Sequence, residues 1–211
     1  MAGDAGAPWV LLPPPVREAF EQLRRAGPAL GDSGLGRPLL GVKCGLNAAF
    51  LVHATEHDDD TATIHDDGRT HLIERVLLRP ALRGDAIARA GVRGRTGSSP
   101  ELRILWTHAA DGAPLRTLPP RTGRWFARYR SQLELRRDAR ARHPWWTLFR
   151  TEAARCESTR LVWADLGRSL RTTILPPGDP TVPLNTCYVL RTASFDDACA
   201  LNTLLTSPVA A

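Results

Sequence analysis

The 211-residue sequence predicts an α+β fold built from small mixed sheets with packed helices. Short apolar runs recur along the chain between Gly, Pro and Asp-Gly turn signals, and this pattern is typical of strands. Segments whose apolar residues follow helical spacing stand between those runs. No internal repeat is present, and no stretch approaches the roughly 18 apolar residues that a membrane span needs. The alternation of short strands with helices therefore favours α+β.

Residues 1–37 are predicted to form an N-terminal tail, a short helix and a linker. The first 15 residues are rich in Gly, Ala and Pro, which is typical of a tail. Residues 16–26 have the spacing of an amphipathic helix, and Gly27-Pro28 should end it. The glycines of residues 31–38 indicate a linker, because the strand and helix that flank a nucleotide-binding loop are missing there.

The remaining residues, 38–211, are predicted to form the main domain. Asp67-Gly68 is a hairpin turn signal, and Pro80 with Gly84 marks a turn before a short helix. Ser194 has the position of a helix N-cap, with Asp197 three residues later, so the last helix should cover residues 198–206. Strands are expected at residues 48–52, 61–65, 102–107, 161–165, 171–175 and 185–190.

The longest helix is expected at residues 122–142. Trp125, Phe126, Tyr129 and Leu133 fall on one stripe at helical spacing, and we interpret these aromatic residues as core packing. The same stripe continues through two arginines, so the helix face should change from apolar to basic over its last two turns.

The distribution of charge favours a polyanionic partner. The chain has a net charge of +6, and all but one of its 28 basic residues are arginine. Residues 116–171 contain 14 arginines and five acidic residues, whereas residues 48–67 contain six acidic residues and no basic one. Such polarisation is expected when one face meets nucleic-acid phosphates and another faces solvent, although a GC-rich genome would also enrich arginine.

The His and Asp residues near residues 57–66 have the composition of a metal site. Consecutive aspartates at a loop tip splay apart and are usually solvated, and no lysine stands nearby to complete a nuclease-type site. We therefore expect an acidic loop without a metal ion, facing away from DNA. The four cysteines are scattered without a C-x-x-C pair, so reduced and mostly buried thiols are expected instead of a zinc site.

No catalytic motif is recognisable. The three Pro-Pro pairs each follow a leucine, and none precedes an aromatic residue, so none can supply the Asn-Pro-Pro-Tyr chemistry of an adenine methyltransferase. A glycine-rich turn for S-adenosylmethionine, a nucleophile elbow, a phosphate-binding loop and an H-E-x-x-H motif are also missing from the sequence.

Several segments, in order, resemble the C-terminal specificity region of TaqI-like class I adenine-N6 DNA methyltransferases and fused restriction-modification enzymes. GVKCGLNAAF at residues 41–50 is similar to "G-V-K-T-G-x-N-x-A-F", and residues 78–87 are similar to "L-K-P-x-L-R-G-R-D-I". Residues 201–207 are similar to "L-x-x-L-L-N-S", and the weaker matches lie at residues 104–106, 133–138, 145–150, 160–165 and 185–189. Cys44 replaces the usual Thr, and Thr206 replaces the usual Asn.

The resemblance implies a target-recognition-domain-like fold that binds double-stranded DNA and is not catalytic alone. S-adenosylmethionine and the flipped adenine would bind a catalytic domain that this chain lacks, so a separate methyltransferase subunit is an expected partner. The family region also continues past its final helix, and we expect a truncated C-terminal end. Candidate phosphate contacts are Arg83, Arg136, Arg137, Arg140 and Arg150, and candidate groove contacts are Lys43, Asn47 and Asn185.

Two alternatives remain open at this stage. Instead of a recognition module for a methyltransferase, the chain could be a stand-alone nucleic-acid-binding protein or a non-functional fragment of a methyltransferase gene. We expect a cytoplasmic protein without a membrane partner, because the apolar run at residues 9–12 is too short for a signal peptide.

Overall fold

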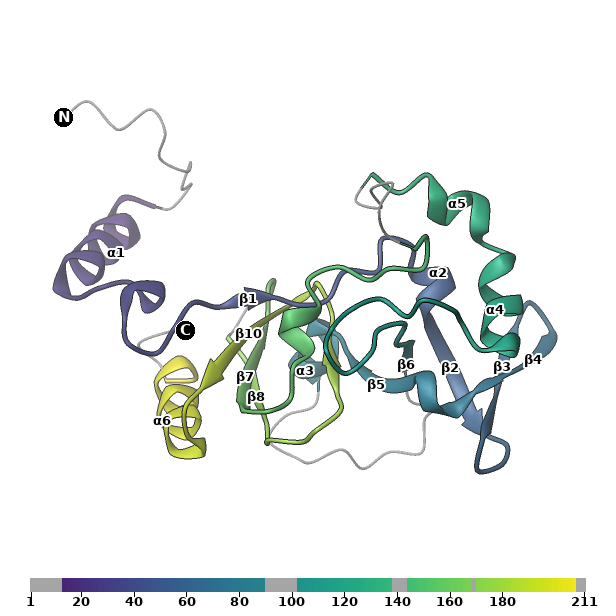
Figure 1. Cartoon of the computed structure of the whole chain (residues 1–211). Helices are drawn as coiled ribbons and strands as arrows, with labels where there is room; N and C mark the ends of the chain where they lie inside the picture. The colour runs from purple at the N-terminus through teal and green to yellow at the C-terminus, as the bar shows by residue number, and fades with distance from the viewer. Residues whose placement is uncertain (1–12, 90–101, 138–143, 168–169, 208–211) are drawn as a thin grey trace. The chain divides into compact units, whose positions relative to one another are not determined.

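The computed structural model describes residues 13–89, 102–137, 144–167 and 170–207 (Figure 1). Helices and two β-sheets make up the described residues, and the predicted α+β class is confirmed. The chain divides into two compact units, residues 1–37 and residues 38–211, and each is described by itself. No helix in the described ranges combines the length and the apolar composition that crossing a bilayer requires.

The first unit contains the amphipathic helix α1 (Pro14–Ala26) and the 3-10 helix η1 (Leu30–Asp32). The predicted helix is confirmed and begins two residues earlier, at a proline pair that its first turn tolerates because those N–H groups have no intrahelical acceptor. The apolar side chains of Val16, Phe20 and Leu23 follow helical spacing, and each is about half exposed.

The second unit contains a six-stranded sheet and a four-stranded sheet. In the larger sheet β5 and β9 are parallel, and the other neighbouring strands are antiparallel. Its strands, in spatial order, are β4 (Arg69–Glu74), β3 (Thr61–Asp66), β2 (Leu51–Glu56), β6 (Leu102–Leu105), β5 (Leu78–Leu82) and β9 (Val182–Pro183). The smaller, antiparallel sheet has the order β1 (Leu39–Leu40), β10 (Cys187–Thr192), β7 (Thr159–Ala164) and β8 (Thr172–Leu175).

Helices of the second unit are short, and they cover or connect the sheets. The α-helices are α2 (Asn47–Phe50), α3 (Gly84–Arg89), α4 (Pro120–Ala127), α5 (Arg130–Glu134) and α6 (Phe195–Leu205), and the 3-10 helices are η2 (Arg75–Leu77) and η3 (Thr151–Ala154). Helix α6 packs against the smaller sheet. The predicted N-cap is confirmed, because the Ser194 hydroxyl accepts a hydrogen bond of 3.0 Å from the amide of Asp197.

The β3–β4 hairpin confirms the predicted Asp-Gly turn. Asp66 pairs with Arg69, so Asp67 and Gly68 alone form the loop, with φ angles of 46° and 73°. A two-residue hairpin loop with positive φ at both positions is the arrangement that Asp-Gly sequences favour, because it matches the twist of the strands.

Apolar side chains form two buried clusters. The larger lies on the six-stranded sheet and includes Phe50, Ile104 and Phe126. The smaller includes Val162 and Val189 of the four-stranded sheet, with Ile87 of α3 packed against them. Trp125, Phe126 and Leu133 are buried, which confirms that the aromatic stripe serves the core.

Several predicted elements differ from the structure in type or extent, and three of them bear on the site. Residues 47–50 form helix α2 where a strand was expected, and the indole of Trp125 donates to the carbonyl of Ala49 there. Residues 138–142 of the helix expected at residues 122–142 lie outside the described residues. The described part is broken into α4 and α5, because Tyr129 leaves the helical region at φ −108° and ψ 5°. The strand expected at residues 185–190 begins at Cys187, because the two preceding residues form a turn.

Glu74 caps helix α4 from a distant strand. The helix opens on Pro119 and Pro120, which offer no capping side chain. Both carboxylate oxygens of Glu74 take that role, accepting from the amide of Arg121 at 2.9 Å and from the amide and hydroxyl of Thr122 at 2.8 and 2.6 Å. Burial raises the pKa of Glu74, but these hydrogen bonds together lower it by more than burial raises it. The net effect is a pKa below the usual value.

Replacing Glu74 with Gln should lower the free energy of unfolding by about 1–2 kcal/mol at neutral pH, because an amide is a weaker acceptor than a carboxylate. Since the folded-state pKa is depressed, the stabilisation is present above the unfolded-state value of about 4.3 and is lost as the pH falls through the folded-state value. Urea unfolding of both proteins at neutral and acid pH measures this difference.

The matched control is Glu134→Gln, which removes an exposed ion pair of 2.8 Å with Arg130. Such a pair contributes less than about 0.5 kcal/mol. A Glu74→Gln difference that stays constant down to acid pH would show that the carboxylate charge does not stabilise the helix.

Candidate nucleic-acid interface

The segment Gly41–Asn47 joins the two sheets of the second unit. The Gly41 amide donates to Cys187 of the smaller sheet at 2.9 Å, and the Val42 amide donates to Pro183 of the larger sheet at 2.8 Å. The Asn185 amide donates to the Val42 carbonyl at 2.9 Å. The segment that the sequence singled out is therefore a backbone junction, and its outer side chains sit where both sheets meet.

Two glycines in this segment are required for different physical reasons. A Cβ on Gly41 would lie 2.1 Å from the carbonyl oxygen of Leu184, so only glycine allows the two backbones to approach this closely. Gly45 has a φ of +73°, and a Cβ there would lie 2.8 Å from Cδ of Arg136. The glycine-bounded pattern is thus explained by packing and backbone conformation.

Lys43 pairs with the segment that carries Arg150. The backbones of Lys43 and Phe149 exchange two hydrogen bonds of 3.0 Å. The neighbours of Lys43 on either side are buried, whereas Lys43 is half-buried and Arg150 is exposed. Arg150 adopts the left-handed backbone conformation, with a φ of 58°, at the start of η3. Two of the predicted basic contacts are therefore brought together by strand-like pairing across about a hundred residues of sequence.

Arg136 was expected to contact phosphate, but the structure places it in the core. Its side chain is 9% exposed and donates to the carbonyls of Cys44 at 2.5 Å, Trp145 at 2.7 Å and Leu133 at 3.2 Å. Its guanidinium carbon lies 5.4 Å from the ring centre of Phe50 and 5.1 Å from that of Phe149. The helical stripe had suggested a solvent-facing arginine, but the break after α4 turns this side chain inward.

The other predicted contacts fall into three groups. Asn47, the first residue of α2, is exposed, as are Arg137 and Asn185. Arg83 is also exposed, and its Nε lies 3.5 Å from a carboxylate oxygen of Asp85. The amide of Gly84, next to Arg83, donates to the hydroxyl of Thr186 at 3.0 Å, which links this arginine to the Asn185 turn. Arg140 lies outside the described residues.

We use the name basic seam for the solvent-accessible candidates that lie in the junction or directly next to a residue that contacts it. Its six members are Lys43, Asn47, Arg83, Arg137, Arg150 and Asn185. The sequence predicted all six, but as separate residues, because it contains no signal that the Asn185 turn and the Phe149 segment pair with Gly41–Asn47.

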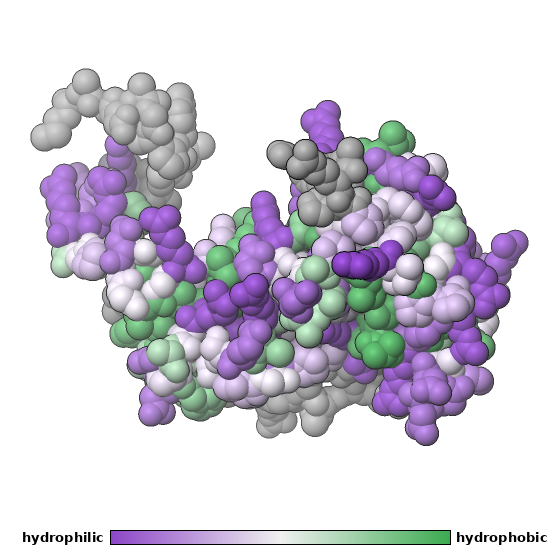
Figure 2. Space-filling model, viewed as in Figure 1, coloured by the Kyte–Doolittle hydropathy of each residue, from purple (hydrophilic) through white to green (hydrophobic). Residues whose placement is uncertain are grey.

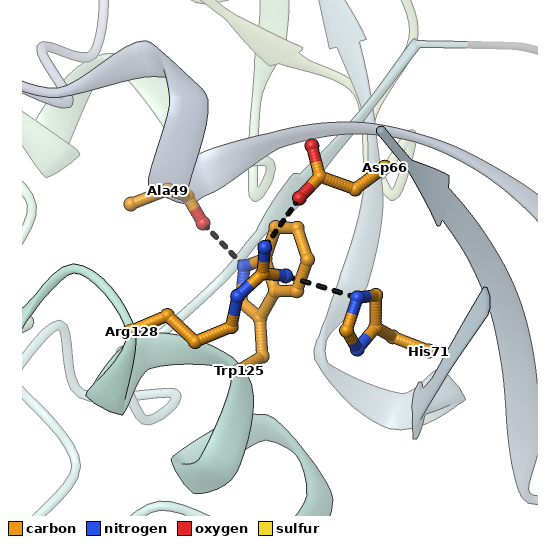
Figure 3. A network of polar contacts seen from close by, with 5 residues as sticks. All are labelled: Ala49, Asp66, His71, Trp125 and Arg128. Atoms are coloured by element: carbon orange, nitrogen blue, oxygen red, sulfur yellow. Dashed lines mark hydrogen bonds and ion pairs between the residues drawn. The ribbon is translucent and has the colours of Figure 1, made fainter. Parts of the chain in front are cut away.

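The long basic run is not one continuous face. Arg128, which directly follows α4, binds Asp66 of β3 at 2.7 Å, donates to His71 of β4 at 3.0 Å and lies over the Trp125 ring at 4.8 Å (Figure 3). Arg160 is fully buried and donates to the carbonyls of Thr181 and Asp179. The arginine-rich and acidic segments therefore meet in space, and sequence reasoning missed this compensation because it compared charges along the chain.

The acidic loop after β2 lies at the opposite end of that strand from α2. Six strand residues separate them, which corresponds to about 20 Å at 3.3 Å per residue. In Figure 1, α2 and the β2–β3 loop mark the two ends of the hairpin. Among the described residues no group of three or more His, Cys, Asp or Glu side chains could hold a metal ion. Because β2 separates this loop from α2, the three aspartates of the loop lie away from Asn47 in the basic seam.

The cysteines are free thiols, two of them buried and two half-buried. Burial raises the pKa of Cys44 to about 12, against the opposing effect of the Arg136 charge, and burial likewise raises the pKa of Cys187 to about 12. A thiol with so high a pKa is almost entirely protonated at neutral pH and is a poor nucleophile. Cys44, where the resembled family has threonine, therefore fills the core beneath the basic seam.

No protein-family model and no curated protein matches this chain.

Replacing Arg136 with Ala should destabilise the second unit by about 3 kcal/mol or more, because buried carbonyls would lose their donor and the two flanking rings would border a cavity. The exposed neighbour substitution Arg137→Ala should change stability by less than about 0.5 kcal/mol. Denaturant unfolding measures both, and the rate at which Cys44 reacts with a thiol reagent gives a local readout. Equal, small effects of the two substitutions would contradict the core role of Arg136.

Replacing Gly41 with Ala should prevent folding or cost several kcal/mol, because the added methyl group would overlap the Leu184 backbone. Gly123→Ala is the matched control, since the nearest atom to its Cβ would be 3.8 Å away and helix α4 would gain a better helix former. We expect this control to fold at wild-type stability or slightly above it. Thermal unfolding compares the two, and a Gly41→Ala protein as stable as the control would refute the packing requirement.

Proposed function

We propose that the second unit is a DNA target-recognition module of the kind found in TaqI-like adenine methyltransferases, acting in the cytoplasm on double-stranded DNA. The observation that supports this most directly is the basic seam. Six residues chosen from the sequence for phosphate or base contact lie in one junction or next to a residue that contacts it, although they come from five separate parts of the chain. The acidic loop lies at the far end of β2, where it would not repel a bound duplex.

In this proposal the arginines set the position of the duplex and the amides read it. Exposed Arg83, Arg137 and Arg150 would neutralise phosphates, which contributes affinity without sequence choice. The side-chain amides of Asn47 and Asn185 have the donor and acceptor that pair with the major-groove edge of adenine. Lys43 would contact a groove acceptor or a phosphate beside them.

Catalysis belongs to another polypeptide or domain in this proposal. The chain lacks the sequence motifs for S-adenosylmethionine and for the flipped adenine, so a methyltransferase subunit would supply both. We expect no methyl transfer by this chain alone. A stand-alone nucleic-acid-binding protein would have the same basic seam, and a preference for particular base sequences separates the two roles.

The proposed contacts predict how binding depends on salt. Removing two phosphate contacts with Arg137→Ala and Arg150→Ala should weaken binding to a mixed-sequence 24-bp duplex about tenfold or more. The slope of log K against log salt should fall in magnitude by about 1.8, because each contact contributes about 0.9. Fluorescence anisotropy over a salt series measures both quantities with the full chain.

The matched control removes two exposed arginines outside the basic seam, Arg69 of β4 and Arg124 of α4. It changes the net charge by the same amount, so it should reduce binding only slightly and leave the slope close to that of the wild type. Equal losses for the two double variants would show that binding follows net charge alone. If the folded wild-type chain does not bind at low salt, the proposed function is wrong.

A further inference from the structure

Leu135 is a large apolar side chain that the fold exposes beside the basic seam. It directly follows α5 and is 83% exposed, whereas Leu133, two residues earlier, is fully buried. In Figure 2 a hydrophobic spot near the top of the view, over the end of α5, is bordered by hydrophilic surface. Single exposed leucines are common on proteins, so exposure alone assigns no role.

The surroundings of Leu135 connect it to the basic seam. Its backbone is held between buried Leu133 and buried Arg136, and the Arg136 guanidinium binds the carbonyls of Cys44 and Trp145. The side chain of Leu135 is thus flanked in sequence by exposed Arg137 and by Arg136, whose side chain contacts the Gly45 turn that leads to Asn47.

An apolar side chain held rigidly among phosphate-binding groups has a known use in DNA recognition. Such side chains enter between adjacent base pairs and partly unstack them, while the neighbouring cations hold the backbone. Enzymes that modify a base must also remove it from the stack, and that step is easiest where pairing is already weakened.

We propose that Leu135 is a wedge that enters the base stack of the bound duplex, beside the groups that hold its phosphates. This inference rests on the proposed DNA-binding function. It adds that the module deforms the duplex itself, and it identifies the side chain that does so. A base next to the wedge would lose a stacking partner, which is the distortion that a base-flipping partner needs.

Two duplexes that differ in one base pair test the wedge. Both are 24 bp long with the same mixed sequence, and one carries a central T·T mismatch, where unstacking costs less. The wild-type chain should bind the mismatched duplex about tenfold more tightly than the matched one, and Leu135→Ala should reduce this preference below about twofold. A 2-aminopurine beside the mismatch should gain fluorescence with the wild type and not with Leu135→Ala.

Two further variants complete the experiment. Leu135→Met keeps a large apolar side chain and should keep most of the preference. Val76→Ala removes an equally exposed aliphatic side chain, 81% exposed, that lies beside Asp59 and Asp60 at the acidic end of the larger sheet, and it should behave as the wild type.

The outcomes separate the two proposals. A wild-type chain that binds both duplexes equally, or a Leu135→Ala chain that retains the preference, overturns the wedge and leaves DNA binding intact. A wild-type chain that binds neither duplex overturns the proposed function and the wedge together. Circular dichroism and thermal unfolding of Leu135→Ala should match the wild type, because the removed side chain makes no core contact.

Discussion

The guanidinium of Arg136 connects three separate parts of the second unit. It donates to the carbonyl of Cys44 in the segment Gly41–Asn47 and to the carbonyl of Trp145. It also donates to the carbonyl of Leu133 in α5, the helix that precedes it. A buried cation is costly unless its donors are satisfied, and here backbone carbonyls and the faces of two phenylalanine rings surround it. The positions of Gly45, Leu135 and Arg137 all follow from this arrangement.

The segment that resembles the methyltransferase specificity region combines structural and candidate functional residues. Gly41, Cys44 and Gly45 serve close backbone approach and core packing, since a larger residue would collide with Leu184 or with Arg136. Lys43 and Asn47 are more accessible and lie on the outside of the same segment. The close packing around Gly41 and Gly45 is therefore enough to explain both glycines without any ligand contact.

Charge along the chain overstated the extent of a continuous basic surface. Arg128 is neutralised by Asp66, while Arg136 and Arg160 are buried against carbonyls. The remaining exposed arginines are divided between the basic seam and other surfaces, such as those of Arg69 in β4 and Arg124 in α4. In the proposed DNA-binding role, the basic seam would therefore bind a short stretch of duplex and leave further contacts to a partner.

Local patterns in the sequence were sufficient where the structure depends on neighbouring residues. The α+β class, the Asp67-Gly68 hairpin, the Ser194 cap and the buried aromatic stripe were all predictable, because turn chemistry and periodicity act within a few residues. The six residues of the basic seam were also recognisable one by one.

Long-range contacts decided the rest of the structure. Trp125 holds the short helix at residues 47–50, and the distant carboxylate of Glu74 caps α4. The inward turn of Arg136 follows from the break between α4 and α5. Only the tertiary structure brings together groups that are a hundred residues apart in sequence. Hydrogen bonds and buried contacts between such distant residues leave no periodic pattern in the sequence.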